Sequence, residues 1–335
     1  MVKTTRTFFS FAALLALPAL SSAAGKSIYG PDDRLDYYEA PAAIQALSDS
    51  VVSLWSRGDV SLSPSTGKYN LSTITLGESN TLCAGEKFYE QATGAFCSGA
   101  LVGEDLVMTA GHCVKNEEEC DELRLVFGFN VAKAGETGVT SVAKSEVYNC
   151  SKIAVRYKAG EPGSPVPAGQ RMGADYALIK LDRKVSGHKP LAINRSAGAA
   201  KDAKIFVIGH PSGLPLKVAA ESKVRDAGKT GYFVADLDTF GGNSGSAVFS
   251  LATHKIEGIL VRGDNDYVYS DEAGCSTVAV FPQDGGRGED VTKIAELATY
   301  VPLLPGEKTG AAQPVDVAPP AGRKAEPLPL RVSFE

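Results

Sequence analysis

At residues 97–113 the chain reads CSGALVGEDLVMTAGHC. The stretch begins and ends with a cysteine, and a histidine directly precedes the second one. The apolar residues Leu106 to Met108 within it predict a strand that leads through Thr109-Ala110-Gly111 to His112. A disulfide between Cys97 and Cys113 would close a loop of about 15 residues and stabilise the fold by about 3 kcal/mol. A histidine held in one orientation by packing and a crosslink is suited to act as a general base.

A glycine-rich turn later in the chain carries a candidate nucleophile. Residues 241–245 read GGNSG, and Ser244 lies there between predicted strands. Glycine lets the backbone approach a substrate closely, so we expect the N–H groups of Gly242 and Ser244 to form an oxyanion hole. Asp175 precedes another predicted strand, and its carboxylate would orient His112 while His112 takes the proton of Ser244.

The order of these residues in the chain distinguishes two classes of serine hydrolase. An α/β-hydrolase needs Gly-x-Ser-x-Gly and places the triad histidine last. Here the serine motif is GNSGS and the candidate histidine comes first. The order His, Asp, Ser therefore predicts a serine hydrolase of a different fold.

Composition and length are those of an ordinary folded protein. The 335 residues are 44% hydrophobic and 22% charged, which allows one large or two small domains. A net charge of −5 argues against nucleic acid as a partner. The chain has no CxxC or His-x-x-x-His spacing, so we expect no metal and no cofactor.

The N-terminus is typical of a secretory signal. Two basic residues precede the short apolar stretch 8–20, and small residues follow it. No later run of about 18 apolar residues occurs, so we predict no membrane anchor. The expected location is therefore extracellular or periplasmic, with residues 1–24 removed as a signal peptide.

Six cysteines in an exported chain indicate three disulfides. Besides Cys97–Cys113, four cysteines remain and allow three pairings. Among these we favour Cys83–Cys120 together with Cys150–Cys275.

Many short strands joined by Gly- and Pro-rich turns predict an all-β sandwich or barrel. The spacing of Val291, Ile294 and Leu297 predicts one C-terminal helix over residues 289–300. We expect four parts: a signal peptide (1–24), a mature N-terminal segment or short propeptide (25–40), a catalytic domain (41–304) and a Pro-rich disordered tail (305–335).

These motifs resemble the chymotrypsin-fold serine proteases. The resemblance is carried by CSG at 97–99, TAGHC at 109–113, DYAL at 175–178 and GNSGS at 242–246. GHP at 209–211 and IYGPDDR at 28–34 are most similar to the glutamyl endopeptidase-like, bacterial trypsin-like branch. The resemblance implies two six-stranded antiparallel β-barrels, with His112 and Asp175 on the first and Ser244 on the second.

Three further positions bear on substrate specificity. Asp238 lies six residues before Ser244, where a trypsin-like pocket carries its aspartate. The resemblance therefore implies cleavage after Arg or Lys, whose charge the carboxylate would bind, with Gly263 keeping the pocket mouth open. Glutamyl endopeptidases have a histidine in the strand after the nucleophile, and Leu260 stands there in this chain.

Together the patterns predict a secreted, monomeric serine endopeptidase that acts on proteins or peptides through an acyl-enzyme. Three alternatives stay open: a catalytically inactive binding protein on the same fold, an esterase that uses the same residues, and a glutamate-specific endopeptidase.

Overall fold

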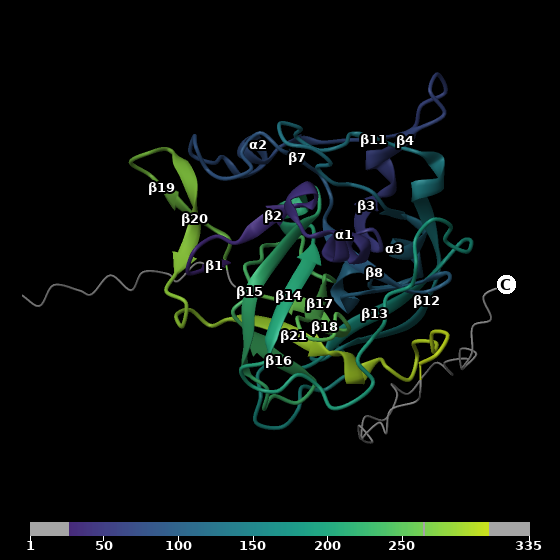
Figure 1. The fold of residues 1–335 in the computed structure, drawn as a ribbon, viewed down its shortest axis with the longest axis vertical. Coiled ribbons are helices and arrows are strands. Elements are labelled where there is room, and N and C mark those ends of the chain that lie inside the picture. The colour runs from purple at the N-terminus through teal and green to yellow at the C-terminus, as the bar shows by residue number, and fades with distance from the viewer. Residues whose placement is uncertain (1–26, 264, 308–335) are drawn as a thin grey trace, which may run out of the picture.

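The chain folds around two six-stranded antiparallel β-barrels that lie side by side (Figure 1). This computed structural model describes residues 27–263 and 265–307. The predicted signal peptide and residues 308–335 of the predicted tail lie outside the described residues. The predicted all-β, chymotrypsin-like architecture is confirmed.

The first barrel closes in the order β10-β12-β13-β9-β8-β3. Its strands are β3 (Val51–Ser56), β8 (Cys97–Gly103), β9 (Leu106–Thr109), β10 (Leu123–Val126), β12 (Val147–Lys158) and β13 (Asp175–Leu181). Every residue of β9 is buried, which explains its unbroken apolar sequence. The register pairs Thr109 of β9 with Ala177 of β13, so Asp175 lies just beyond the end of β9, where the chain turns toward His112.

The second barrel runs β14-β17-β18-β21-β16-β15 and closes because β15 also pairs with β14. Its strands are β14 (Lys204–Gly209), β15 (Lys217–Asp226), β16 (Tyr232–Ala235), β17 (Ala247–Ser250), β18 (Ile256–Arg262) and β21 (Glu289–Lys293). The N-terminal strand β2 (Arg34–Asp36) adds to the edge of β15. The glycine-rich turn that contains Ser244 lies between β16 and β17 of this barrel.

The predicted C-terminal helix is wrong. Glu289–Lys293 form β21, which pairs with both β16 and β18, and only a single 3₁₀ turn, η6 (Ile294–Glu296), follows. The acidic residues at the start of this segment are buried beside specific partners. Glu289 accepts a hydrogen bond from Thr239, and Asp290 pairs with Arg262.

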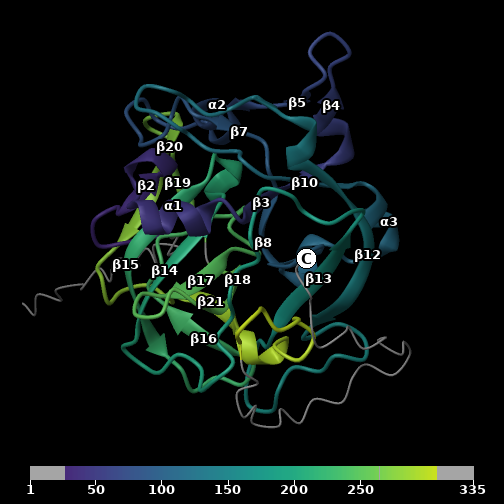
Figure 2. The same ribbon diagram turned by 45° about the vertical axis from the view of Figure 1, so that its right-hand side comes forward.

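Smaller elements surround the barrels (Figure 2). The additional strands are β1 (Ser27–Tyr29), β19 (Tyr267–Ser270) and β20 (Cys275–Phe281) in one sheet, β4 (Val60–Leu62), β5 (Tyr69–Leu71) and β11 (Ser141–Val142) in a second, and β6 (Ile74–Thr75) with β7 (Ala92–Thr93). The short helices are α1 (Ala42–Ser48), α2 (Leu76–Asn80), α3 (Glu117–Asp121), η1 (Tyr37–Glu39), η2 (Arg57–Asp59), η3 (Gly111–Cys113), η4 (Lys144–Glu146) and η5 (Pro211–Gly213). None of the helices in the described ranges has the length and apolar character needed to cross a membrane.

Three disulfides join the six cysteines. Cys97–Cys113 is confirmed, whereas the other predicted pairing is wrong, because the bonds are Cys83–Cys275 and Cys120–Cys150. Helix α3 packs on β12, which brings Cys120 to Cys150. The N–H of Cys83 donates to the Ser276 carbonyl, which aligns Cys83 with β20.

Candidate active site

The structure brings His112 and Asp175 into direct contact. Asp175 Oδ2 lies 2.7 Å from His112 Nδ1, and Asp175 Oδ1 accepts the backbone N–H of His112 at 3.1 Å. The carboxylate is 1% exposed and the imidazole 29% exposed. An acceptor at Nδ1 favours the tautomer with its proton there, which leaves Nε2 as the basic nitrogen.

The His112 turn depends on close approach of three segments. A Cβ on Gly111 would lie 2.6 Å from the Tyr157 carbonyl and 2.9 Å from Asp175 Oδ1, so only glycine fits. Arg156 Nε donates to the Gly111 carbonyl at 2.6 Å. The same guanidinium forms a bidentate pair with Glu161, at 2.7 and 2.9 Å.

Asp175 is also tied to the second barrel. Its N–H donates to the hydroxyl of Thr292 at 3.0 Å, and that hydroxyl donates to the Asp175 carbonyl at 3.0 Å. Thr292 lies on β21, and both residues are buried. Nothing local in the sequence indicates the roles of Thr292, Arg156 and Glu161, because their contacts join segments far apart in the chain.

The Ser244 turn is fastened to the start of β8. The Ser244 carbonyl accepts the N–H of Ser98 at 2.8 Å, and it lies 3.6 Å from Cys113 Sγ, beside the disulfide next to His112. Gly245 has a φ of 93°, and a side chain there would collide with the Ser98 carbonyl and the Thr109 hydroxyl. Glycine is therefore needed at position 245 for the turn to pack against Ser98 and Thr109.

Two peptide N–H groups of this turn are oriented by the carbonyls that precede them. The carbonyl before Gly242 accepts the N–H of Ser212 at 2.5 Å, and the carbonyl before Ser244 accepts the N–H of Ser246 at 2.9 Å. In a trans peptide the N–H points opposite to the carbonyl. Within residues 27–263 and 265–307 neither the Gly242 nor the Ser244 N–H has an acceptor, so both are available to a ligand.

The Ser244 turn lies close to the His112 turn, because the Ser244 carbonyl is 3.6 Å from the sulfur of Cys113. No hydrogen bond joins the Ser244 hydroxyl to His112 in the part of the chain that the structure describes, and both side chains are half-buried. Cys97, His112 and Cys113 offer three atoms within 4.8 Å of one another, the kind of group that can hold a metal. Both sulfurs belong to the disulfide, however, and the thiolate is the form that binds metal.

The three candidate specificity residues lie in different surroundings. Asp238 is 4% exposed and accepts the N–H groups of Tyr29 at 2.8 Å and Asp33 at 3.3 Å. Burial, with Asp33 nearby, raises the pKa of the Asp238 carboxyl. Leu260 is buried in the core of the second barrel, whereas Gly263 is exposed just after β18.

Part of the chain is similar to known proteins. Residues 97–259 match the family model of the trypsin-like peptidase domain. The chain is 25% identical over 178 residues to the secreted RxLR effector protein 73 of Plasmopara viticola, a match that covers 50% of this chain and 41% of that protein. The chain thus spans about two fifths of the length of that curated relative.

Two solved structures are similar over 76% of this chain. One is the Rv3671c protease in an inactive form, with 13% identity, 88% of its chain covered and a TM-score of 0.40. The other is a Glu endopeptidase in complex with MPD, with 18% identity, 94% of its chain covered and a TM-score of 0.42.

The double barrel defines a chymotrypsin-like fold, and residues 97–259, just under half of the chain, match the trypsin-like peptidase domain. The resemblance to chymotrypsin-fold serine proteases that the motifs indicated is thereby confirmed.

Proposed function

We propose that this protein is a serine endopeptidase with Ser244 as nucleophile, His112 as general base and Asp175 as the group that orients the imidazole. The observation that carries the proposal is the buried Asp175 carboxylate, which contacts both the ring and the backbone of His112. A carboxylate in this position stabilises the imidazolium that forms when the histidine takes a proton.

The proposed reaction uses two steps. Ser244 Oγ attacks the substrate carbonyl carbon while His112 Nε2 accepts its proton, and the N–H groups of Gly242 and Ser244 donate to the oxyanion. His112 then gives the proton to the leaving amine as the C–N bond breaks. Water, activated by the same histidine, hydrolyses the ester bond to Ser244 and restores the enzyme.

We also propose that the protein is secreted and acts as a monomer. Three disulfides are typical of an oxidising compartment, and the curated relative from Plasmopara viticola is described as secreted. The residues of the site come from both barrels of one chain, so catalysis needs no second copy.

Cleavage after Arg or Lys, through Asp238, is a separate proposal. The contacts of Asp238 with Tyr29 and Asp33, and its raised pKa, weaken its attraction for a cationic side chain near neutral pH. Profiling the products of a peptide library decides the matter. Products ending in Arg or Lys support a role for Asp238, and products ending in Glu support the glutamate-specific alternative.

A serine-reactive fluorophosphonate probe tests the central proposal. We expect the mature protein to be labelled, Ser244→Ala to lose the label, and Ser250→Ala, which removes a half-exposed hydroxyl at the end of β17, to keep it. An unlabelled wild-type protein would refute catalysis and favour the inactive binding protein. Comparing casein with short acyl esters separates a protease from an esterase.

A further inference from the structure

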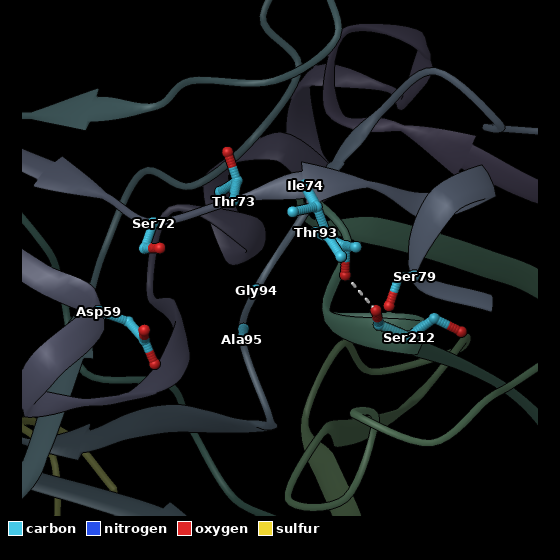
Figure 3. Close-up of a pocket in the computed structure, with 9 residues that line it drawn as sticks. All are labelled: Asp59, Ser72, Thr73, Ile74, Ser79, Thr93, Gly94, Ala95 and Ser212. Atoms are coloured by element: carbon cyan, nitrogen blue, oxygen red, sulfur yellow. Dashed lines mark hydrogen bonds between the residues drawn. The ribbon is translucent and has the colours of Figure 1, made fainter. Parts of the chain in front are cut away.

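A pocket of about 340 Å³ lies on the surface (Figure 3), and Ser212 in its wall is hydrogen-bonded to Gly241 in the turn that contains Ser244. Segments 72–74 and 93–95 line it together with Asp59, Ser79 and Ser212. In Figure 3 Asp59 stands on one side of the space, and Ser79 and Ser212 stand on the other. The volume is at the small end of the range for ligand pockets and suits one long side chain.

Hydrogen bonds join the wall of this pocket to the proposed oxyanion hole. Ser212 donates its N–H to the carbonyl that precedes Gly242, at 2.5 Å. The hydroxyl of Thr93 donates to the Ser212 carbonyl, and the N–H of Gly94 donates to the carbonyl of Gly213 at 3.1 Å. One short turn therefore forms part of the pocket and also orients a proposed oxyanion donor.

Under the proposed function, the connection of the pocket wall to the Cys97–Cys113 disulfide beside His112 points to the leaving-group side of the scissile bond. This step rests on the proposed function, in which His112 protonates the leaving amine. One residue, Phe96, separates residues 93–95 from Cys97, whose disulfide partner Cys113 follows His112. Each residue of an extended peptide adds about 3.4 Å, so the first three positions after the scissile bond are the ones to compare.

The charge of the pocket is negative. Asp59 is the one charged residue that lines it, and among the described residues its carboxylate has no hydrogen bond or ion pair. The nearest basic residue in the sequence, Arg57, pairs instead with Glu122 at 3.5 Å. The hydroxyls of Ser72 and Ser79 also have no partner in the described ranges.

The remaining wall suits an aliphatic stem. Ile74 lines the pocket and is 56% exposed, a large fraction for an isoleucine. Lysine and arginine combine an apolar stem with a charged end, and they place each part against matching surface. A carboxylate with two free hydroxyls nearby supplies the acceptors that an ammonium or guanidinium group needs.

We propose that this pocket binds a lysine or arginine side chain of the substrate on the leaving-group side of the scissile bond. Asp59 accepts the charge-assisted hydrogen bond, and Ile74 covers the stem. Specificity on this side is thereby separate from the pocket for the residue before the scissile bond.

Internally quenched peptides test the proposal once a cleaved sequence is known. Each peptide carries lysine, or its uncharged analogue norleucine, at one of the first three positions after the scissile bond. We expect kcat/KM to be about 10-fold higher for lysine at one position, the effect of one hydrogen bond to a charged group. Asp59→Asn should lower the lysine value to that of norleucine, whereas Glu78→Gln, at an exposed carboxylate outside the pocket, should keep the preference. Equal rates for the two peptides, or a preference that survives Asp59→Asn, overturn the proposal.

A binding measurement separates this proposal from the proposed function. Fluorescence polarisation compares the same lysine and norleucine peptides on the Ser244→Ala protein, which needs no catalysis. Tighter binding of the lysine peptide that depends on Asp59 supports the pocket even if no peptide is cleaved. Fluorophosphonate labelling of Ser244 without any lysine preference supports the peptidase and refutes the pocket.

Discussion

His210 predicts an acid-sensitive step in stability that one substitution should remove. Its side chain is buried and stacks on Phe129, with ring centroids 5.8 Å apart. Nδ1 lies 3.0 Å from the Leu214 carbonyl and donates to it, while Nε2 is buried with no partner among the described residues. Burial, together with the charge of Lys217, lowers the pKa of His210 to about 3.

The magnitude follows from the difference between the folded and unfolded states. A histidine in the unfolded chain has a pKa of about 6.5, so between pH 6.5 and 3 the unfolded state binds more protons than the folded state. Stability in this window therefore falls as the pH falls. At pH 4 the gap to 6.5 is about 2.5 units, and each is worth about 1.4 kcal/mol, so His210 alone should cost about 3 kcal/mol relative to pH 7.

Urea unfolding at pH 7 and pH 4 measures this cost. Ser244→Ala should be the common background, because it prevents self-digestion. We expect His210→Asn, which keeps a donor near the Nδ1 position but does not titrate, to lose about 3 kcal/mol less than the background protein between the two pH values. His254→Asn, which removes a half-exposed imidazole, is the matched control. An equal loss with and without His210 would refute the reasoning, because the buried imidazole would then not be the group that titrates.

Three further substitutions test the site. Asp175→Asn should lower kcat about 10⁴-fold with the fold intact, because the histidine loses its orienting carboxylate, and kinetics with thermal unfolding measure this. Gly245→Ala should destabilise the protein by at least about 1–3 kcal/mol, since it combines a φ of 93° with a clash against Ser98, whereas Gly128→Ala, at positive φ but in open space, should retain activity. Arg156→Lys should lower kcat about 10-fold while it changes KM little, because the bidentate pair of Arg156, which also holds the Gly111 carbonyl next to His112, is lost. A change confined to KM would contradict this.

Short motifs predicted the parts of the site whose geometry is local. Strand β9 ends at Thr109, one residue after the apolar run and three residues before His112. Cys97 and Cys113 are only 16 residues apart in the chain, so their bond was predictable from the sequence. The glycines around Ser244 indicated a turn because such backbone angles are open to glycine and costly for other residues. These features depend mainly on neighbours in the chain.

Contacts between distant segments were not predictable in this way. Thr292 holds Asp175 across 117 residues, and Arg156 reaches the carbonyl before His112 across 45 residues. The segment that contains Thr292 has a spacing that fits a helix, but pairing with strands on both sides makes it a strand. Asp238 illustrates the same limit, because its neighbours in space come from the N-terminal segment.

The sequence by itself determined the chemical groups, their order and the turns that present the histidine and the serine, because backbone geometry over a few residues follows from the side chains present. Only the tertiary structure decided how the other four cysteines pair, which strand closes the second barrel, which residues support Asp175 and what occupies the space around Asp238. Those choices depend on burial and hydrogen bonding between segments that meet only when the two barrels close. Many ways of pairing these segments are compatible with the local sequence pattern, but few of them give the buried polar groups hydrogen-bond partners.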